Sequence, residues 1–547
     1  MRRHARGLLS ALLTADLVLA GTAQASSAPL PDIPGAVLPS TVFDSTFLRG
    51  IDLDQVTVLD LQHAMDTHRL SSVALTSFYL DRIQALNPTL HAVIETNPDA
   101  LKDAAASDRH RRQQGGRGPL EGIPVLLKDN IDTADRTHTT AGSYALLGAR
   151  PAQDAYLVQR LRAAGAIVLG KANLSEWAHF RSFVGPSGWS PRGGQTANPY
   201  VLDRNPCGSS SGSAVAAAAD LATVTIGTDT AGSVVCPAGA NDDVGIRPTL
   251  GLVSRSGLIP ITAQMDTAGP ITRNMTDAAA VLQVIQGVDP ADPATAAATP
   301  YTGRDYLAAL DKNALRGKRI GVWRGGGDVP EANAVLASTI KTLRQKGAVI
   351  VDDIALPGFT DLLNDGLPAV ELEFKHDFNA YLAALPGDHP ADLAALIAYD
   401  DAHASVEMPY FGQDNFIQAQ ATSGDESDPA YQQLRAAVTA AARNTIDTAM
   451  AADHLDAILA PTNAPAWVTD LQAGDPPTIL PAYSGAVAVA GYPELTVPAG
   501  YDSHGVLPIG MSFFGGRFSE PTLISLGYAL EQATHARRAP TFLPTLP

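Results

Sequence analysis

Cysteine is scarce in this 547-residue chain, which holds only Cys207 and Cys236. Two cysteines cannot build the disulfide framework of a small secreted domain. Without patterned histidines they also fall short of the four ligands of a usual zinc site, so we predict no metal site. A secreted protein could pair the two, but we interpret both as small, buried hydrophobic residues.

Basic residues are also few, since 38 Lys and Arg stand against 56 Asp and Glu and the formal net charge is −18. A chain with this balance lacks the electrostatic basis for binding nucleic acid or an anionic membrane. Beyond the N-terminal region, no run of about 18 uninterrupted apolar residues occurs, so no membrane span is predicted. The hydrophobic fraction of 45% is that of a globular protein with a large core.

The N-terminus has the pattern of an export signal. A basic start at residues 2–6 precedes a largely apolar run from Leu8 to Ala20, and Ala23-Gln24-Ala25 fits a small-residue cleavage site. The alternative is a disordered, basic N-terminus. We expect a secreted or periplasmic protein with three parts: a signal peptide over 1–25, an N-terminal arm over 26–50 and a catalytic domain over 51–547.

Hydrophobic periodicity predicts strands that alternate with helices, which implies an α/β architecture with a largely covered sheet. Strands are expected at Val125–Leu127, Ala166–Leu169, Val224–Gly227, Arg319–Trp323, Ala348–Val351, Ala457–Ala460, Leu495–Val497 and Gly510–Phe514. Helices are expected at Ala100–Gln114, Ala155–Ala164, Ala214–Ala222, Ala332–Gln345 and Thr522–Ala533, with two more between Thr57 and Leu86.

Two segments interrupt this alternation. Asp289–Ala298 is a low-complexity connector rich in Asp, Pro and Ala. Pro357–Tyr431 mixes helical segments with loops, and we expect it to form an insert that covers the active site and shapes the substrate pocket.

Two Gly/Ser-rich turns, at Cys207–Ser213 and Gly227–Ser233, are the most informative feature of the chain. Each offers a serine hydroxyl among residues small enough for backbone N–H groups to converge on one point. Acyl transfer needs this combination of an activated hydroxyl and a cradle for an oxyanion. Upstream, Lys128 follows the apolar run Ile123–Leu127, which can bury its amine and lower its pKa.

These segments resemble the amidase signature family, and the likeness extends from about Leu59 to Thr541. The shared pattern is GIPVLLKD at 122–129, CGSSSGS at 207–213, GTDTAGS at 227–233 and GIRPT at 245–249. Within the family, the likeness is to bacterial peptide amidases, through stretches such as KANLSEW at 171–177 and VVCP at 234–237. The resemblance implies a single large α/β domain, a mixed β-sheet core with helices on both faces.

The resemblance also implies roles for particular residues. Ser233 is expected to be the nucleophile, Lys128 the base, and Ser209, preceded by a cis peptide bond, the bridge between them. The oxyanion would be held by backbone N–H groups of this turn, namely those of Thr230, Ala231 and Gly232 together with Ser233. The substrate-binding wall is assigned to Gln195, Thr196 and Ser210.

Local sequence leaves other roles open for the catalytic candidates. Ser233 could cap a helix, and Ser209 could belong to a loop that caps the helix starting near Ser213. Lys128 could be a strand-end lysine paired with Asp129 or Asp132.

Two further motifs compete with this assignment. Residues 208–212 satisfy G-x-S-x-G, which would make Ser210 the nucleophile of an α/β-hydrolase elbow, but that elbow follows a strand and 198–205 has the composition of a loop. Residues 338–341 satisfy S-x-x-K, but they lie in a predicted surface helix without partner motifs. We therefore favour neither motif.

Three aspartates near the second turn need separate comment. Asp229 is expected to organise the turn through hydrogen bonds, a structural role. Asp242 and Asp243 replace a more apolar segment of the family pattern, and the sequence offers no physical account of them.

The main hypothesis is a secreted amidase that needs neither metal nor organic cofactor and no obligate protein partner. The likeness to peptide amidases implies that it converts C-terminal peptide amides to the free acid and ammonia. The alternatives are an amidase or esterase for small aryl or aliphatic amides, the amidating subunit of a tRNA-dependent amidotransferase, and a non-enzymatic binding protein. The export signal and the acidic balance argue against the amidotransferase, and the intact Lys128, Ser209 and Ser233 argue against the binding protein.

Overall fold

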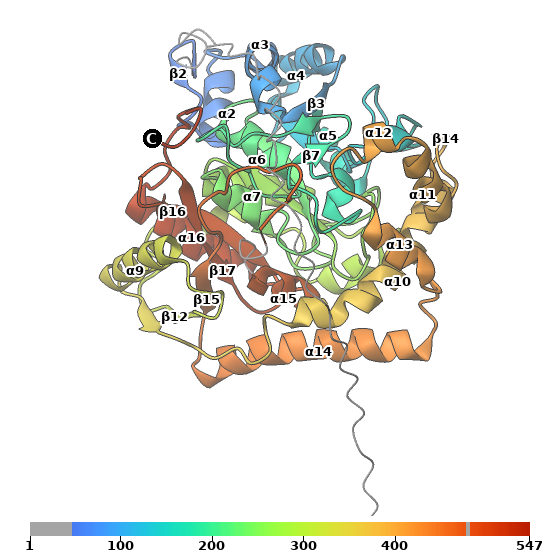
Figure 1. Cartoon of the computed structure of the whole chain (residues 1–547). Helices are drawn as coiled ribbons and strands as arrows, with labels where there is room; N and C mark the ends of the chain where they lie inside the picture. The colour runs from blue at the N-terminus through green and yellow to red at the C-terminus, as the bar shows by residue number, and fades with distance from the viewer. Residues whose placement is uncertain (1–45, 477–481) are drawn as a thin grey trace, which may run out of the picture. The chain divides into compact units, whose positions relative to one another are not determined.

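A central sheet of eleven strands organises the described part of the chain, which comprises residues 46–476 and 482–547 of a computed structural model (Figure 1). The predicted signal peptide and residues 26–45 of the predicted arm lie outside the described residues. In spatial order the strands are β13 (Val349–Val351), β12 (Arg319–Val322), β15 (Ala457–Pro461), β17 (Pro508–Phe514), β16 (Glu494–Tyr501), β10 (Val244–Arg247), β11 (Thr267–Thr272), β9 (Val224–Asp229), β4 (Pro124–Lys128), β6 (Ile167–Ala172) and β3 (Val93–Thr96).

The sheet is mixed, with two parallel groups joined by antiparallel strands. Strand β4 runs parallel to both β6 and β9, and β12 runs parallel to β13 and β15. Leu127 pairs with Ile226, so β4 and β9 end side by side. Because carboxyl ends of parallel strands are the usual place for a site in an α/β sheet, this pairing brings Lys128 next to the start of the second serine turn.

Apolar composition explains why β4 and β9 lie in the middle of the sheet. Every residue of the two strands is buried, including the polar ends Lys128 and Asp229. Parallel strands that are covered on both faces need nearly continuous apolar sequence, as PVLLK and VTIG provide.

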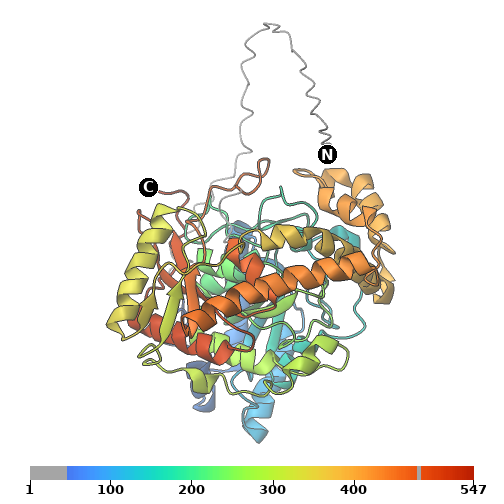
Figure 2. The same ribbon diagram turned by 90° about the horizontal axis from the view of Figure 1, so that it is seen from below.

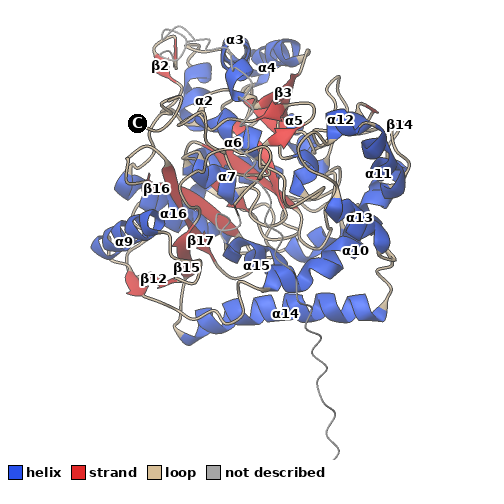
Figure 3. Ribbon diagram, in the orientation of Figure 1, coloured by secondary structure: helices blue, strands red, loops and turns tan. Residues whose placement is uncertain are grey.

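Helices cover both faces of the sheet (Figure 3). Helix α6 packs against α7, and α8 packs against α5 and α16. No helix among the described residues is long and apolar enough to cross a membrane. The helices are α2 (Val58–Asp66), α3 (Ser72–Leu90), α4 (Ala100–Gln114), α5 (Tyr156–Ala163), α6 (Ser211–Ala218), α7 (Val235–Ala240), α8 (Met275–Ile285), α9 (Pro330–Gln345), α10 (Leu362–Ala384), α11 (Leu393–Ala402), α12 (Ala404–Glu407), α13 (Asp414–Ala421), α14 (Pro429–Ala452), α15 (Ala482–Ala490) and α16 (Glu520–Thr534).

Short elements complete the described chain. Three two-stranded ribbons are β1–β2 (Phe47–Leu48 and Ile51–Asp52), β5–β14 (Gly148–Ala149 and Gly387–Asp388) and β7–β8 (Trp189–Ser190 and Gly194–Gln195). The 3₁₀ helices are η1 (Tyr144–Leu146), η2 (Glu176–His179), η3 (Pro293–Ala298) and η4 (Leu307–Ala309).

The predicted insert over 357–431 forms helices α10 to α13, which gather at the right of Figure 1. Helix α14 lies alongside α10 (Figure 2). Side chains of the insert reach the loops around the central strands: Tyr381 donates to Asp132, and Glu407 accepts from Ser143. The insert therefore braces the loop that follows β4.

Most predicted elements are present, with ends that differ by a few residues, and α4 has the predicted bounds. Strands β3, β10 and β11 of the central sheet are not among the expected strands. The segment 289–298, interpreted as a connector, is folded into the domain, since Ser254 donates to Asp289 and Arg255 bonds Asp292. It separates no domains, because residues 46–547 form one unit.

Candidate functional site

Lys128 lies at the carboxyl end of β4 with its side chain fully buried. Its Nζ donates to Ser209 Oγ at 2.7 Å, and to Oγ1 and the carbonyl oxygen of Thr228 at 3.0 and 3.3 Å. Burial lowers the pKa of Lys128 from 10.5 to about 7, while the negative charges of Asp229 and Asp266 act in the opposite direction. The geometry thus joins Lys128 to the first serine turn, with an amine that can be neutral near neutral pH.

The two aspartates that follow Lys128 have other partners. Asp129 accepts from Thr140 Oγ1 and from the backbone N–H of Gly142, and Asp132 accepts from Tyr381 at 2.9 Å. No ion pair in the described part of the chain includes Lys128. The strand-end pairing of Lys128 with Asp129 or Asp132, left open by the sequence, is therefore not formed.

Ser209 lies in the first serine turn, directly after a cis peptide bond from Gly208, as the family resemblance implied. Ser209 is buried, and its carbonyl oxygen accepts from the Ser175 backbone N–H at 3.0 Å. The next backbone N–H, that of Ser210, donates to the carbonyl oxygen of Ser233 at 3.2 Å. This bond holds the two serine turns against each other.

The Ser210 hydroxyl joins the first serine turn to β9. Its Oγ donates to the Thr228 carbonyl oxygen at 3.0 Å and accepts from the Thr228 N–H at 3.2 Å, which fixes the start of α6 to β9. The strand before it, β8, ends at Gln195, well before Gly208. The strand–turn–helix context of a nucleophile elbow is therefore absent around Ser210.

Asp229 organises the second serine turn, as predicted. Its carboxylate accepts from the backbone N–H groups of Gly232 at 3.0 Å and Val234 at 2.7 Å, and it pairs with the buried Arg247 at 2.5 Å. Gly232 has φ = +100°, and a Cβ there would lie 3.1 Å from Ser484 Oγ, so the turn requires glycine at this position. Ser233 follows it, partly exposed, and Val234 then leads into α7.

One predicted oxyanion donor is already engaged. The N–H of Gly232 points to Asp229, so this group holds the turn in shape. The other three predicted donors, the N–H groups of Thr230, Ala231 and Ser233, remain candidates for binding the oxyanion.

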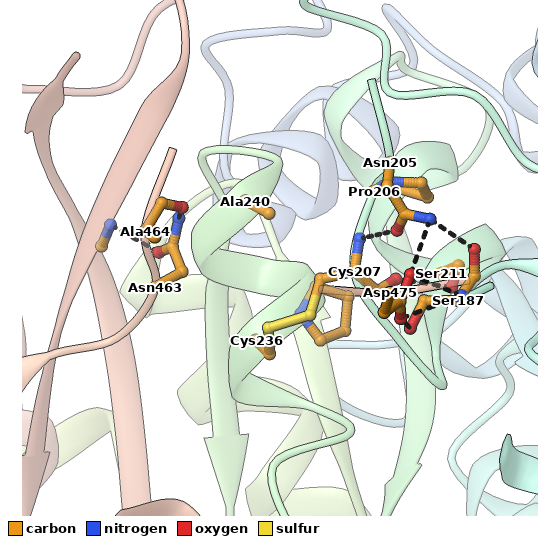
Figure 4. Close-up of a disulfide and its surroundings, with 12 residues drawn as sticks. Ser187, Asn205, Pro206, Cys207, Ser211, Cys236, Ala240, Asn463, Ala464 and Asp475 are labelled. Carbon is orange, nitrogen blue, oxygen red and sulfur yellow. Dashed lines mark hydrogen bonds between the residues drawn. A yellow bond between two sulfur atoms is a disulfide. The ribbon is translucent and has the colours of Figure 1, made fainter. Parts of the chain in front are cut away.

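Cys207 and Cys236 form a disulfide, with an Sγ–Sγ distance of 1.97 Å, and the interpretation of both as unpaired hydrophobic residues is wrong (Figure 4). Cys207 lies two residues before Ser209 and Cys236 three residues after Ser233. The bond therefore ties one serine turn to the other. The position of one cysteine beside each turn, together with the predicted export signal, is the sequence signal for this pairing.

The environment of Cys207 is a dense hydrogen-bond network (Figure 4). Asn205 Oδ1 accepts from the Cys207 N–H at 2.8 Å, and Asn205 Nδ2 donates to the Ser187 carbonyl oxygen at 2.9 Å. Asp475 accepts from the backbone N–H and the hydroxyl of Ser187, the latter at 2.5 Å. This network connects the first serine turn to the segment that follows β15.

Gln195 and Thr196 lie beside the first turn, but their polar groups make internal bonds. Gln195 Nε2 donates to carbonyl oxygens of Ser187 and Thr196 at 2.9 and 3.0 Å. Thr196 is buried, and its hydroxyl donates to the His91 carbonyl oxygen at 2.9 Å. The assignment of Gln195, Thr196 and Ser210 to a substrate-binding wall stays a prediction.

Asp242 and Asp243, which local sequence leaves unexplained, are both buried. Asp242 accepts from the hydroxyls of Tyr200 and Tyr501 and from the backbone N–H of Arg538, and burial raises its pKa to about 6. Burial raises the pKa of Asp243 as well, opposed by the charge of Arg537. Asp242 therefore anchors the C-terminal segment through Tyr501 and Arg538, partners far away in sequence.

Comparison with known proteins agrees with this geometry. A family model described as Amidase matches residues 74–524. The crystal structure of a peptide amidase from Stenotrophomonas maltophilia superposes with a TM-score of 0.84 at 49% identity, covering 89% of this chain and 99% of that one.

Two curated relatives extend the comparison. A protein of Arabidopsis thaliana described as a probable amidase is 43% identical over 501 residues, covering 90% of this chain and 92% of the relative. A glutamyl-tRNA(Gln) amidotransferase subunit from a Roseiflexus species is 35% identical over 510 residues, covering 90% of this chain and 99% of the relative.

Proposed function

Because the chain belongs to the amidase family and is an amide-hydrolysing enzyme, we propose that it uses Lys128, Ser209 and Ser233 to hydrolyse C-terminal peptide amides. The observation that carries the proposal is the 2.7 Å contact between the buried Lys128 amine and Ser209 Oγ. A lysine with a pKa of about 7 is roughly half neutral at neutral pH and can act as a general base.

In the proposed first step, neutral Lys128 accepts the Ser209 proton while Ser209 accepts the Ser233 proton. Ser233 Oγ forms a bond to the carbonyl carbon of the substrate, and the carbonyl oxygen becomes an oxyanion. The N–H groups of Thr230, Ala231 and Ser233 are the proposed donors to that oxygen. Donors held rigid in this way stabilise charge that develops only in the transition state.

The same relay completes the reaction in the opposite direction. The proton on Lys128 passes back through Ser209 to the leaving nitrogen, the C–N bond breaks, and ammonia departs. Water then attacks the acyl-enzyme, its proton follows the same path, and the free acid leaves with Ser233 regenerated. No group outside the three side chains has to carry a proton.

Peptide amides are the proposed substrate because of the narrower likeness. The solved relative at 49% identity is a peptide amidase, whereas the amidotransferase protein is a more distant relative at 35%. Small aryl or aliphatic amides are the alternative substrates. An ammonia-release assay with an amidated peptide panel, acetamide and benzamide separates these classes, and activity confined to the two small amides would reject the peptide substrate.

Export from the cytoplasm is part of the proposal, on the basis of the N-terminal pattern at residues 1–25. The Cys207–Cys236 disulfide supports it, since such bonds persist mainly in oxidising compartments. N-terminal sequencing of protein from its native host is expected to begin near Ser26. Protein that begins at Met1 or Arg2 in a cytoplasmic fraction would reject export.

The nucleophile is tested directly by Ser233→Ala. We expect no acyl-enzyme and no ammonia release, and a fluorophosphonate is expected to label Ser233 in the unaltered enzyme. Ser210→Ala is the matched control, since Ser210 carries the hydroxyl of the competing motif but bonds to Thr228. Labelling of Ser210, with Ser233→Ala still active, would overturn the assignment.

A further inference from the structure

Asp266 connects to the second serine turn through its side chain. Thr230, the first residue of the turn after β9, donates from Oγ1 to Asp266 Oδ1 at 2.6 Å. The other carboxylate oxygen accepts from the backbone N–H groups of Ile261 at 2.7 Å and Thr262 at 3.0 Å. Three donors therefore fix the orientation of one buried carboxylate, and that carboxylate fixes Thr230.

The loop that carries Asp266 is itself held by the insert. Thr262 Oγ1 donates to Glu373 Oε2 of α10 at 2.5 Å, and the Ala263 N–H donates to Asp377, one turn further along the same helix, at 2.7 Å. Arg435 of α14 holds Glu373 in turn, with Nε donating at 2.6 Å. A continuous set of bonds thus runs from the insert to Asp266 and the turn.

Asp266 also places charge near the base. Burial lowers the pKa of Lys128, and the charges of Asp229 and Asp266 oppose that effect. Burial raises the pKa of Asp266 to about 6, while Arg255 opposes this shift and the charge of Asp377 is also close. Asp266 is therefore one of two carboxylates whose negative charge favours the protonated form of Lys128.

We propose that Asp266 is a positioning residue for amide hydrolysis, which orients Thr230 at the start of the oxyanion turn and contributes negative charge that favours protonated Lys128. The proposal rests on the function proposed above. It makes two separate predictions, because loss of the Thr230 bond affects the turn alone, whereas loss of the charge also affects the base.

The test uses Asp266→Asn, Thr230→Val and Thr230→Ser, with phosphonylation of Ser233 by a fluorophosphonate measured across pH. Asp266→Asn keeps the size of the side chain but removes the charge that favours protonated Lys128. The phosphonylation rate is expected to fall at low pH as Lys128 becomes protonated, and this acid limb of the pH profile is expected to move to lower pH by about half a unit or more in Asp266→Asn. Above pH 8 the rate is expected to be reduced about tenfold. Thr230→Val is expected to lose about tenfold without a shift, and Thr230→Ser, which keeps the hydroxyl, to stay within about threefold.

Asp277→Asn is the matched control, since Asp277 is another fully buried carboxylate that accepts a backbone N–H, that of Val58 at 2.7 Å. It is expected to keep the rate and the position of the limb. Thermal unfolding of each variant shows that it is folded at the assay temperature. The two Thr230 variants decide the question if Asp266→Asn does not fold.

An unshifted limb in folded Asp266→Asn, or equal rates for Thr230→Val and the unaltered enzyme, would overturn the positioning role while the proposed function stands. Failure of the unaltered enzyme to be labelled at Ser233 and to release ammonia from amidated peptides would instead reject the proposed function. Steady-state kinetics of ammonia release from an amidated peptide give kcat and KM separately. We expect Thr230→Val to lower kcat and to change KM little.

Discussion

Two fully buried lysines, Lys128 and Lys171, lie on the neighbouring parallel strands β4 and β6 but have different surroundings. The Lys128 amine contacts the hydroxyls of Ser209 and Thr228. The Lys171 amine donates to the Ile131 carbonyl oxygen at 2.6 Å and to the Thr139 hydroxyl at 2.8 Å. Hydrogen-bond partners alone would not separate the two sites.

The two lysines differ in the number of carboxylates that act on them. Burial lowers the pKa of both lysines, but four carboxylates oppose the shift at Lys171, those of Asp129, Asp132, Asp135 and Glu95. Only two, those of Asp229 and Asp266, do so at Lys128. Lysine is an effective base only where it can be neutral, so the difference suits Lys128 to proton transfer and Lys171 to structure.

The largest expected effect is on activity, from replacement of Lys128. Lys128→Met is expected to reduce kcat/KM by about 10²–10⁴-fold, the usual contribution of a general base. Lys128→Arg is expected to be as inactive, because a guanidinium stays protonated. Ammonia release from an amidated peptide measures this, and an active Lys128→Arg enzyme would mean that the residue acts as a fixed charge.

The stability of the same variant sharpens the comparison. Lys128 has a lower pKa in the folded enzyme than in the unfolded chain, so the unfolded state binds the extra proton at neutral pH. The free energy of unfolding is therefore lowered as the pH falls from 10.5 to about 7, and the reduction is complete below about pH 7. Lys128→Met removes this penalty, so we expect chemical denaturation at pH 7 to show no loss of unfolding free energy.

Replacement of Lys171 is expected to have the opposite outcome. Lys171→Met removes the one cation that acts on the buried Asp132 and one of the two that act on Asp129, the other being Arg192 at 3.7 Å. Loss of a charged partner from a buried set costs up to about 3–5 kcal/mol. The free energy of unfolding is expected to fall by this amount, while the folded fraction keeps kcat within a few-fold. Loss of kcat in folded Lys171→Met would show that the two lysines do not divide the roles in this way.

The Cys207–Cys236 disulfide is expected to stabilise the serine turns next to Lys128 by about as much as Lys171 stabilises its own surroundings. Cys207→Ala with Cys236→Ala opens a loop with a sequence separation of 29 residues, for which chain entropy predicts a loss of about 3–4 kcal/mol. Denaturation midpoints of the double variant and the unaltered enzyme measure it. Equal midpoints would mean that packing alone holds the two serine turns together.

The sequence predicted the strands around Lys128 well because their cause is local. Continuous apolar runs give β4, β6 and β9, and the motif residues give the turns. Strand β11 (Thr267–Thr272), with sequence TAGPIT, contains Gly and Pro and has no strand pattern of its own. It is a strand because it pairs with β9 and β10, a tertiary effect that local propensity does not contain.

The same reason explains what sequence reasoning missed in the site. Cys207 and Cys236 have a Cα–Cα distance of 5.9 Å, a proximity that only the folded chain provides. Asp266 reaches Thr230 across 36 residues, and Asp242 reaches Arg538 across 296. Motifs name residues whose chemistry is local, whereas residues that orient them are defined by contacts at long sequence separation.

The smallest expected effect concerns Asp129, which adjoins Lys128 in sequence but acts electrostatically on Lys171. In the unaltered enzyme kcat/KM is expected to fall about tenfold per pH unit below about pH 7, as Lys128 becomes protonated. Asp129 opposes the pKa shift of Lys171 but is not among the charges that act on Lys128. Asp129→Asn is therefore expected to leave the acid limb within about 0.3 pH unit, whereas Asp266→Asn moves it. A pH–rate profile measures both, and a downward shift in Asp129→Asn would mean that the two lysines share one electrostatic environment.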